Sequence, residues 1–430
     1  NRTSRRTRCM NELNLIAINL TKRCNLACDH CYLDATTLKQ GTADELTTRE
    51  VNLILDQVHA LNPDAMVVLT GGEPLLREDL EEIIEHGSQL GLFIVAGTNG
   101  IQLTSSRVHS LQAAGLMGVG VSLDSIYPEK HDNFRGKSGS WQKTMKGLEN
   151  CREQELSFQV HFTVTRMNRD EIHDIIALSE EIGARVVNIF FLICTGRGDT
   201  ASDLTPDEYE TALKHIIQVQ ESYPDMIVRP RCAPHFKRVA MQMNPDAEIN
   251  RISGQEGDGC LAGIHYCRIN SSGDVTACPY IETAVGSTRE QPFTHIWNDS
   301  AEFAGLRNPD LDGKCGMCEY RSLCGGCRAR PFAQGDGLFG SDLLCSYIPE
   351  GGPLIEPLRD PNEVSWDEAA LVRLERIPGF IRKMVKKKAE AYVLDNSESI
   401  VRVRHLEELT ARRFGSNRQK KPKLFARTTD

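Results

Sequence analysis

The chain has 430 residues, 40% of them hydrophobic and 25% charged, with a formal net charge of -9. This length predicts two or three domains, and the acidic balance argues against a general nucleic-acid-binding protein. No apolar run approaches the length of a membrane span and the first ten residues do not resemble a signal peptide, so we expect a cytoplasmic protein.

Short apolar runs alternate with helical patterns over the first half of the chain. Strands are expected at Leu13–Leu20, Ala65–Leu69, Phe93–Ala96, Gly118–Ser122, Ser157–Thr165 and Val186–Phe191. Helices are expected near Thr47–Leu61, Asp79–Leu90, Ser105–Ala114, Trp141–Gln154 and Asp170–Ile182. The first helix opens with a capping box, Thr47-Thr48-Arg49-Glu50. Six strands with helical crossovers predict a parallel sheet, either open or curled into a partial barrel.

The remaining chain predicts a change of architecture. A helix near Thr205–Tyr223 completes the unit 13–225, which follows a tail, 1–12, and precedes a basic bridging region, 226–259. Residues 260–350 hold eight cysteines with little periodicity, so cross-links or metal must order them. A linker, a small helical domain and a basic tail are then expected at 351–364, 365–415 and 416–430. A second capping box, Ser365-Trp366-Asp367-Glu368, opens the helical domain.

Fifteen cysteines are too many to be incidental. Disulfide frameworks belong mainly to short secreted domains, so clustered cysteines in this chain indicate metal ligation. Cys24, Cys28 and Cys31 lie within eight residues. A structural zinc site takes four ligands, whereas a [4Fe–4S] cluster held by three thiolates leaves one iron open. His30 is a possible fourth ligand, but a residue between two ligating cysteines is expected to point elsewhere.

The spacing C-x3-C-x2-C directly after a first strand resembles that of the radical S-adenosylmethionine (SAM) superfamily. The resemblance implies an α/β fold with a partial (β/α)6 TIM-like barrel. It also implies a catalytic [4Fe–4S] cluster on Cys24, Cys28 and Cys31, whose open iron site binds S-adenosyl-L-methionine. An electron from that cluster cleaves SAM to methionine and a 5′-deoxyadenosyl radical.

Motifs after the next three strands strengthen the resemblance. Gly71-Gly72-Glu73-Pro74 matches the family motif for the SAM amino group: the glycines permit close approach and the glutamate accepts from an ammonium. The resemblance implies further cofactor contacts from Tyr32 near the adenine, from Arg135 to the SAM carboxylate, and from Thr98, Asn99, Ser122 and Asp124. The alternative for each is an ordinary polar residue at a strand end, but barrel enzymes place their chemistry there.

The cysteines after residue 259 resemble the SPASM extension of radical SAM enzymes, which carries two auxiliary [4Fe–4S] clusters. By that resemblance one cluster is held by Cys260, Cys267, Cys278 and Cys327. The other is held by Cys315, Cys318, Cys324 and Cys345. The last pair, "CGGC", has two intervening residues where the family usually has three, which leaves the allocation of Cys324 and Cys327 open. Two zinc knuckles are the alternative.

The motifs fix the radical chemistry but not the substrate. "FFLICTGRGD", "CLAGIHYCRINSSGDVTACPY" and "GKCGMCEYRSLCGGCRAR" together resemble the tetrapyrrole branch, which trims acetate or propionate side chains in alternative haem and haem d1 biosynthesis. The C-terminal unit resembles the helical domain of the dark-operative protochlorophyllide reductase B subunit, the alternative being a generic helical cap. That pattern comprises Trp366, Ala369, Leu374, Ile377, Pro378, Arg382 and Ala389.

The sequence therefore predicts an oxidoreductase or lyase that abstracts hydrogen from a tetrapyrrole side chain and removes a carboxyl-bearing fragment. Arg197, Arg229, Arg231 and His235 are candidate substrate contacts because several carboxylates require cationic partners. A solvated basic loop is the alternative for them. Ferredoxin or flavodoxin is the expected electron donor, and an auxiliary cluster would accept an electron. A peptide-modifying maturase forming thioether or carbon–carbon cross-links and a multi-cluster electron-transfer protein are the other readings.

Overall fold

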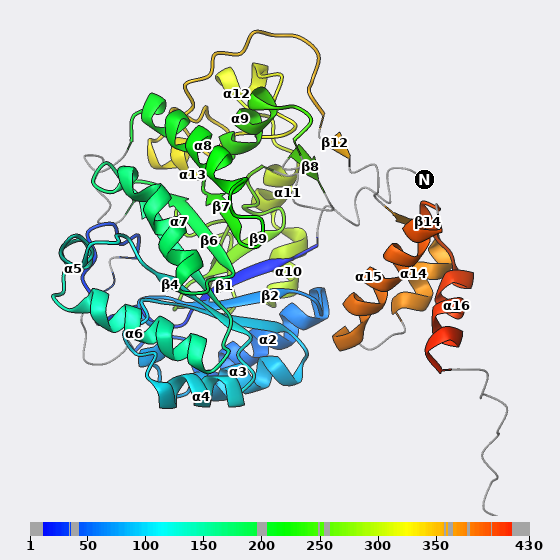
Figure 1. Cartoon of the computed structure of the whole chain (residues 1–430), viewed down its shortest axis with the longest axis horizontal. Helices are drawn as coiled ribbons and strands as arrows, with labels where there is room; N and C mark the ends of the chain where they lie inside the picture. The colour runs from blue at the N-terminus through cyan, green and yellow to red at the C-terminus, as the bar shows by residue number, and fades with distance from the viewer. Residues whose placement is uncertain are drawn as a thin grey trace, which may run out of the picture. The chain divides into compact units, whose positions relative to one another are not determined.

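The computed structural model describes residues 12–33, 35, 43–195, 204–247, 250–252, 259–356, 358–359, 364–375, 379–396 and 398–414. The chain divides into two compact units, Asn1–Leu358 and Arg359–Asp430, whose elements are labelled in Figure 1. No helix among these residues is both long enough and apolar enough to cross a membrane.

One sheet of ten strands organises the first unit, in the order β11-β10-β9-β1-β2-β3-β4-β5-β6-β7. The six predicted strands are present, with ends within two residues of those expected: β1 (Leu15–Asn19), β2 (Met66–Thr70), β3 (Phe93–Thr98), β4 (Gly118–Ser122), β5 (Phe158–Val164) and β6 (Val186–Phe191). A further strand, β7 (Ile227–Arg231), pairs in parallel with β6. The predicted α/β class with a parallel, barrel-like sheet is confirmed.

Six helices follow the strands where they were expected: α2 (Thr48–Leu61), α3 (Leu80–Gln89), α4 (Ser105–Ala113), α6 (Ser140–Glu153), α7 (Ile172–Glu181) and α8 (Pro206–Gln220). Two further helices, α5 (Pro128–Arg135) and α9 (His235–Met243), were not predicted. Two 3-10 turns, η1 (Pro74–Leu76) and η2 (Arg169–Glu171), interrupt the loops. The capping box at Thr47 is confirmed, because Thr47 and Glu50 exchange side-chain and backbone hydrogen bonds. The α2–α8 helices cover the outer side of the sheet (Figure 1).

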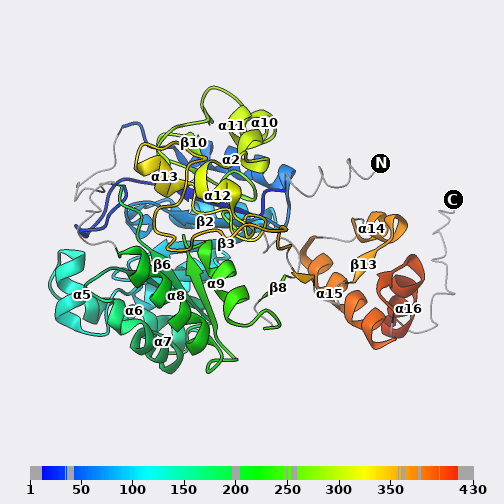
Figure 2. The same ribbon diagram turned by 90° about the horizontal axis from the view of Figure 1, so that it is seen from above.

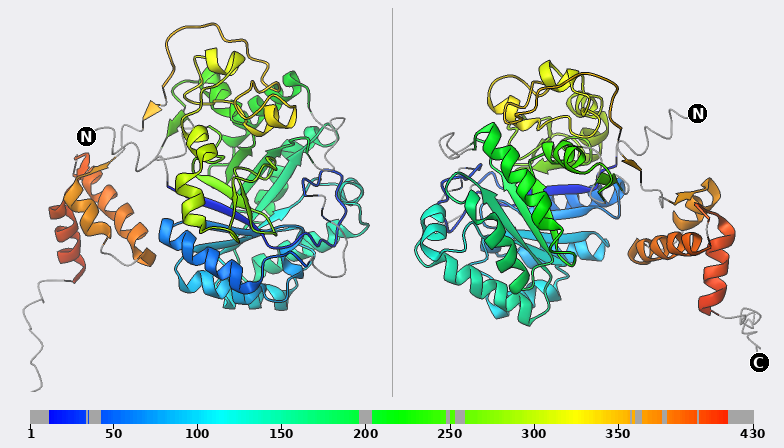
Figure 3. Two further views of the ribbon diagram at one scale, coloured as in Figure 1. Left: turned by 180° about the vertical axis from the view of Figure 1, so that it is seen from behind. Right: turned by 45° about the horizontal axis from the view of Figure 1, so that its top comes forward.

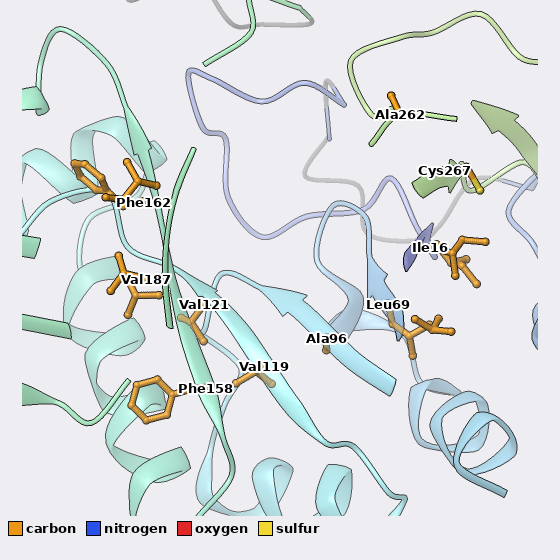
Figure 4. Packing of buried hydrophobic residues seen from close by; sticks show 14 of the residues in the cluster. Ile16, Leu69, Ala96, Val119, Val121, Phe158, Phe162, Val187, Ala262 and Cys267 are labelled. Atoms are coloured by element: carbon orange, nitrogen blue, oxygen red, sulfur yellow. The ribbon is translucent and has the colours of Figure 1, made fainter. Parts of the chain in front are cut away.

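The sheet has an apolar, buried face and a polar face. Residues of β5 alternate between buried Phe158, Val160, Phe162 and Val164 and half-buried Gln159, His161 and Thr163. The buried set packs into one apolar core with residues of β1, β2, β4 and β6, as Figure 4 shows for Ile16, Leu69, Val121 and Val187. Because side chains alternate along a strand, the polar set of β5 faces the interior of the barrel.

The cysteine-rich segment extends the same sheet. Strand β9 (Tyr266–Ile269) pairs in parallel with β1, and β10 (Asp274–Thr276) and β11 (Gly286–Ser287) follow in antiparallel order. Helices α10 (Phe293–Asp299), α11 (Ala301–Arg307), α12 (Gly313–Met317) and α13 (Ala329–Ala333) complete it. Figure 2 shows this yellow-green segment on one side of β1 and β2, away from α5–α8. Two short strands, β8 (Arg251–Ile252) and β12 (Leu358–Arg359), lie outside the main sheet.

The second unit has its own small core. It contains β13 (Ser365–Trp366), α14 (Glu368–Glu375), α15 (Gly379–Asp395), β14 (Ile400–Val401) and α16 (Val403–Phe414), around buried Ala370, Ala389, Val393, Val401 and Leu406. The predicted capping box at Ser365 is wrong. Ser365 belongs to a strand whose N–H donates to Ser399, and the Asp367 side chain instead accepts from the Ala370 N–H at 2.7 Å. Ile377 and Pro378 lie outside the described residues.

Candidate functional site

The three clustered cysteines lie in the loop after β1, at the carboxyl ends of the parallel strands. Cys24 and Cys28 are buried and Cys31 is half-buried, in one small cluster with Leu26 and Ala35. Burial, together with the smaller effects of the Glu73, Cys28 and Cys31 charges, raises the pKa of Cys24 to about 11. The loop is fixed by backbone bonds to α5, from the Ala27 N–H to Arg135 O at 3.2 Å and from the Asp29 N–H to Phe134 O at 3.2 Å.

His30, the possible fourth ligand, lies against Phe134 of α5. Its ring stacks on Phe134, with centroids 4.3 Å apart and planes 6° from parallel. This position agrees with the expectation that a residue between Cys28 and Cys31 points elsewhere.

The "GGEP" turn lies against the same loop. A Cβ on Gly71 would lie 2.5 Å from Thr21 O, and one on Gly72 would lie 2.3 Å from Arg23 O. The Gly72 N–H donates to Thr21 O at 2.7 Å and the Glu73 N–H to Arg23 O at 2.8 Å. The glycines therefore allow close approach of the turn to the protein's own backbone, directly before Cys24.

Glu73 is fully buried and collects donors from β3. Thr98 Oγ1 donates to its Oε1 at 2.8 Å, the Asn99 N–H to its Oε2 at 2.8 Å, and the Leu75 N–H to its Oε1 at 3.1 Å. Burial raises the pKa of Glu73, and these three bonds act in the opposite direction. A carboxylate has about four lone-pair sites, so one remains for a further donor. Asn99 in turn donates to Asn25 Oδ1 at 2.7 Å, next to Cys24.

Asp124 and Arg135 form a buried ion pair beside Cys28. The Arg135 guanidinium lies 3.6 Å from Cys28 Sγ, and Asp124 Oδ1 accepts from the Thr163 N–H at 2.9 Å. Burial raises the pKa of Cys28, and the Arg135 charge lowers it. Ser122 ends β4 on the barrel's polar face. Of the predicted cofactor contacts, Glu73, Thr98, Asn99, Asp124 and Arg135 are therefore brought together around the cysteine loop.

Tyr32 occupies a position between the cysteine loop and the cysteine-rich segment. Its ring lies 5.4 Å from that of Tyr280, and its hydroxyl interacts with the Asn19 side chain and with the charges of Arg268, Cys31 and Cys278. The predicted adenine contact of Tyr32 stays a prediction.

A row of polar side chains crosses the interior of the barrel and extends to the Asp124–Arg135 pair. Arg231 Nε donates to Asn188 Oδ1 at 2.9 Å, and Asn188 Nδ2 donates to Gln159 Oε1 at 2.8 Å. His161 interacts with the charges of Arg231, Asp124 and Arg135, so the row reaches the Asp124–Arg135 pair. Arg229 lies two residues before Arg231, on the same face of β7. Gln159, His161 and Asn188 were not predicted, although polar residues at alternate positions of "FQVHFTV" were a signal.

The other two candidate substrate contacts lie elsewhere. Arg197 lies outside the described residues. His235 is 1% exposed, and its Nε2 lies 3.0 Å from Asp342 Oδ2. Arg330 Nη1 lies 3.2 Å from the same carboxylate oxygen. His235 therefore faces the cysteine-rich segment and not the barrel interior.

The four cysteines of one predicted auxiliary group lie together. Cys315, Cys318, Cys324 and Cys345 line a single pocket, together with Arg238 and Lys314. Two backbone N–H groups point at its sulfurs, Gly326 to Cys324 at 3.4 Å and Asp342 to Cys315 at 3.5 Å. Figure 3 shows this yellow segment beside the green α9, which carries Arg238. Four thiols in one cationic, amide-lined pocket fit a [4Fe–4S] cluster, because each iron takes one thiolate.

The "CGGC" turn separates two groups of thiols. Gly325 and Gly326 both adopt left-handed backbone conformations, with φ of 61° and 74°. Cys324 consequently faces the pocket, while Cys327 interacts with Cys260 and Cys232. Cys278 interacts with the same Cys232, Cys260 and Cys327, whereas Cys267 lies apart, with Arg307 as its charged neighbour. Three of the four predicted thiols are brought together here. Within the described residues, no three His, Cys, Asp or Glu side chains converge on a point suited to a single metal ion.

Comparison with protein families matches three segments of the chain. Residues 18–179 match the radical SAM superfamily, 260–319 the iron–sulfur cluster-binding SPASM domain, and 366–409 the 57 kD subunit of proto-chlorophyllide reductase. The crystal structure of SuiB of Streptococcus suis bound to S-adenosylmethionine superposes with a TM-score of 0.65 at 16% identity, covering 80% of each chain. That likeness supports the fold.

Two curated relatives match this chain over most of their own length. The AdoMet-dependent heme synthase of Methanosarcina barkeri is 39% identical over 78% of this chain and 97% of its own. The mycofactocin maturase MftC of Mycolicibacterium smegmatis is 30% identical over 81% of this chain and 86% of its own. The protein is a radical SAM enzyme, and it belongs to the SPASM-containing family that includes the AdoMet-dependent heme synthases.

Proposed function

We propose that this enzyme removes carboxyl-bearing fragments from the acetate or propionate side chains of a tetrapyrrole during haem formation. The observation that carries the proposal is the polar row inside the barrel. In this row Arg231 donates a hydrogen bond to Asn188, and His161 is close enough to feel the charges of Arg231, Asp124 and Arg135. A cation in a largely enclosed barrel is the partner that a substrate carboxylate needs. The 39% identity to a heme synthase along nearly its whole length supports the same substrate class.

The residues around the first cysteine loop suit the two cofactors of the family. Cys24, Cys28 and Cys31 would hold a [4Fe–4S] cluster, and that cluster with S-adenosyl-L-methionine supplies a 5′-deoxyadenosyl radical. Glu73 presents a buried carboxylate to an ammonium, held in place by Thr98 and Asn99. Arg135 presents a guanidinium fork to a carboxylate, beside Ser122 and Asp124.

Oxidative loss of a carboxyl fragment leaves an electron that the enzyme must pass on. Two auxiliary [4Fe–4S] clusters in 260–350 would receive it, and a ferredoxin or flavodoxin would supply the reducing electron to the first cluster. Tyr32 and Tyr280 lie between Cys31 and Cys278, which places two aromatic rings between the radical site and the nearer auxiliary group. This arrangement supports electron exchange between them.

Peptide maturation is the second candidate, favoured by the 30% identity to a mycofactocin maturase. Binding of iron-coproporphyrin III to the reconstituted enzyme, followed by its visible absorption band, separates the two. We expect a band shift, and we expect Arg231→Gln to weaken binding about tenfold or more, as loss of a charged hydrogen bond does. Arg185→Gln is the control, because Arg185 is exposed outside the barrel. If no tetrapyrrole causes a band shift, the substrate proposal fails and a peptide becomes the favoured substrate.

A further inference from the structure

Strand β9 directs Cys267 away from the other cysteines of its expected cluster. Tyr266 interacts with Cys278 and Tyr32, so it faces the cysteine side of the strand. Cys267 is the next residue and therefore points to the opposite face. There it is 0% exposed, pairs in register with Ile16 of β1 and packs in the apolar core, as Figure 4 shows. A free cysteine in such a place behaves as a small hydrophobic residue.

Cys232 is a neighbour of the three other cysteines of that expected cluster. It follows directly after β7, about thirty residues before the SPASM segment, in the turn that leads to α9. Its thiol interacts with Cys260, and it is a neighbour in turn of Cys278 and Cys327. The Tyr280 side chain also forms a hydrogen bond with the Cys232 thiol. Cys232, Cys260, Cys278 and Cys327, from four separate segments, are therefore all electrostatic neighbours of one another.

The backbone at Cys232 is held in an unfavourable conformation. Its φ is 56°, in the left-handed region that side-chain-bearing residues seldom adopt. Tyr209 Oη donates to its carbonyl at 3.0 Å and Arg330 Nη2 donates at 2.8 Å. Arg330 also pairs with Asp342, whose Oδ2 accepts from the Cys327 N–H at 2.9 Å. One buried network therefore fixes both Cys232 and Cys327, and such strain is typical of functional positions.

We propose that Cys232, and not Cys267, is the fourth thiolate of the auxiliary [4Fe–4S] site formed with Cys260, Cys278 and Cys327. The proposal rests on the cofactor content proposed above but not on the identity of the substrate. It gives β7 a second role, because the strand that carries Arg231 into the barrel also delivers a cluster ligand one residue later. The auxiliary cluster is then attached directly to the substrate-facing strand.

Iron counting in a background without the radical cluster tests this assignment. The full chain with Cys24, Cys28 and Cys31 all replaced by Ala is reconstituted anaerobically, and iron and the EPR spectrum of the reduced protein are measured. About eight irons are expected, four for each auxiliary cluster. Adding Cys232→Gly removes the thiol while suiting the left-handed backbone. We expect about four irons, or an altered EPR signal from one cluster. Glu155→Gly is the matched control, since Glu155 also has a positive φ of 58°.

Cys267→Ala in the same background supplies the independent arm, and it is expected to keep about eight irons and an unchanged EPR spectrum. Loss of about four irons in Cys267→Ala overturns the assignment whatever Cys232→Gly does. Unchanged iron and EPR in Cys232→Gly overturns it as well. Fewer than about four irons in the background protein also overturns it, because no auxiliary cluster would then exist for Cys232 to hold.

Discussion

At Gly72 the requirement for glycine comes from the protein's own backbone. A Cβ there would lie 2.3 Å from Arg23 O and 2.7 Å from Arg23 C, and no side-chain movement relieves a clash with backbone. Because Arg23 precedes Cys24, the clash would displace the loop that carries the radical-cluster cysteines. The motif predicted that this glycine lets a ligand approach closely. The structure shows that Gly72 is also needed for the turn to pack against the backbone at Arg23.

We predict that Gly72→Ala lowers the free energy of unfolding by about 1–3 kcal/mol, as overpacking does, and reduces occupancy of the radical cluster. Urea unfolding and iron content measure the two effects. Gly305→Ala is the control, because a Cβ at Gly305 has its nearest contact at 3.4 Å from the Phe339 ring. Full iron content together with wild-type stability in Gly72→Ala would refute the role of this turn.

Single residues also show which site residues a local sequence pattern can identify and which it cannot. Spacing identified Cys24, Cys28, Cys31 and Glu73 because all four lie within local motifs whose neighbours in sequence are neighbours in space. Spacing also selected Cys267, since it lies between Cys260 and Cys278. The face of β9 on which Cys267 lies depends on pairing with β1, about 250 residues earlier, which no local pattern records.

At the scale of elements, the end of β4 and the start of α5 share one buried histidine. His131 is 1% exposed, and its Nδ1 accepts from the Asp124 N–H at 3.2 Å. Burial and the neighbouring Arg135 charge lower the pKa of His131 to about 4, although Asp124 and Asp132 act in the opposite direction. The ring is consequently neutral in the folded protein at neutral pH.

This histidine predicts a pH dependence of stability. The unfolded chain binds a proton at His131 below about pH 6.5, whereas the folded chain does so only near pH 4, where its pKa lies. Stability is therefore complete above pH 6.5 and decreases as pH falls toward 4. His131→Asn keeps an acceptor for the Asp124 N–H and removes the titration, so we expect it to reduce the loss between pH 6.5 and 5 by about 2 kcal/mol. Chemical denaturation at several pH values measures this, and an unchanged slope would contradict it.

Strands β1–β6 and helices α2, α3, α4, α6, α7 and α8 were predictable because their apolar periodicity is local. The capping box at Thr47 was predictable for the same reason, since Thr47 and Glu50 satisfy each other. Helices α5 and α9 were not predicted. The capping box expected at Ser365 is absent because Ser365 belongs to a strand that pairs in parallel with β14, and its N–H donates to Ser399. Asp367 caps α14 instead. Likewise β7 is too short and too polar, "IVRPR", to be seen without β6 beside it.

At the scale of the molecule, the cofactor chemistry lies within the first unit. All eleven candidate cluster cysteines and Cys232 precede residue 346, and the second unit has a core of its own around Ala370, Ala389 and Val401. We predict that the chain shortened to 1–358 folds and still holds about twelve irons after reconstitution, four for each of three clusters. Iron analysis beside the full chain tests this, and a loss of clusters in the shortened chain would show that the second unit is needed for assembly.

The central claim is that the radical formed in this barrel takes hydrogen from a tetrapyrrole side chain. The most direct measurement uses iron-coproporphyrin III deuterated on the side-chain carbons next to the ring, with S-adenosyl-L-methionine and dithionite, and mass analysis of the 5′-deoxyadenosine released. The account predicts 5′-deoxyadenosine that carries deuterium, formed together with loss of the carboxyl fragment. Product accompanied only by unlabelled 5′-deoxyadenosine, or labelled substrate recovered intact while a peptide is modified, would contradict it.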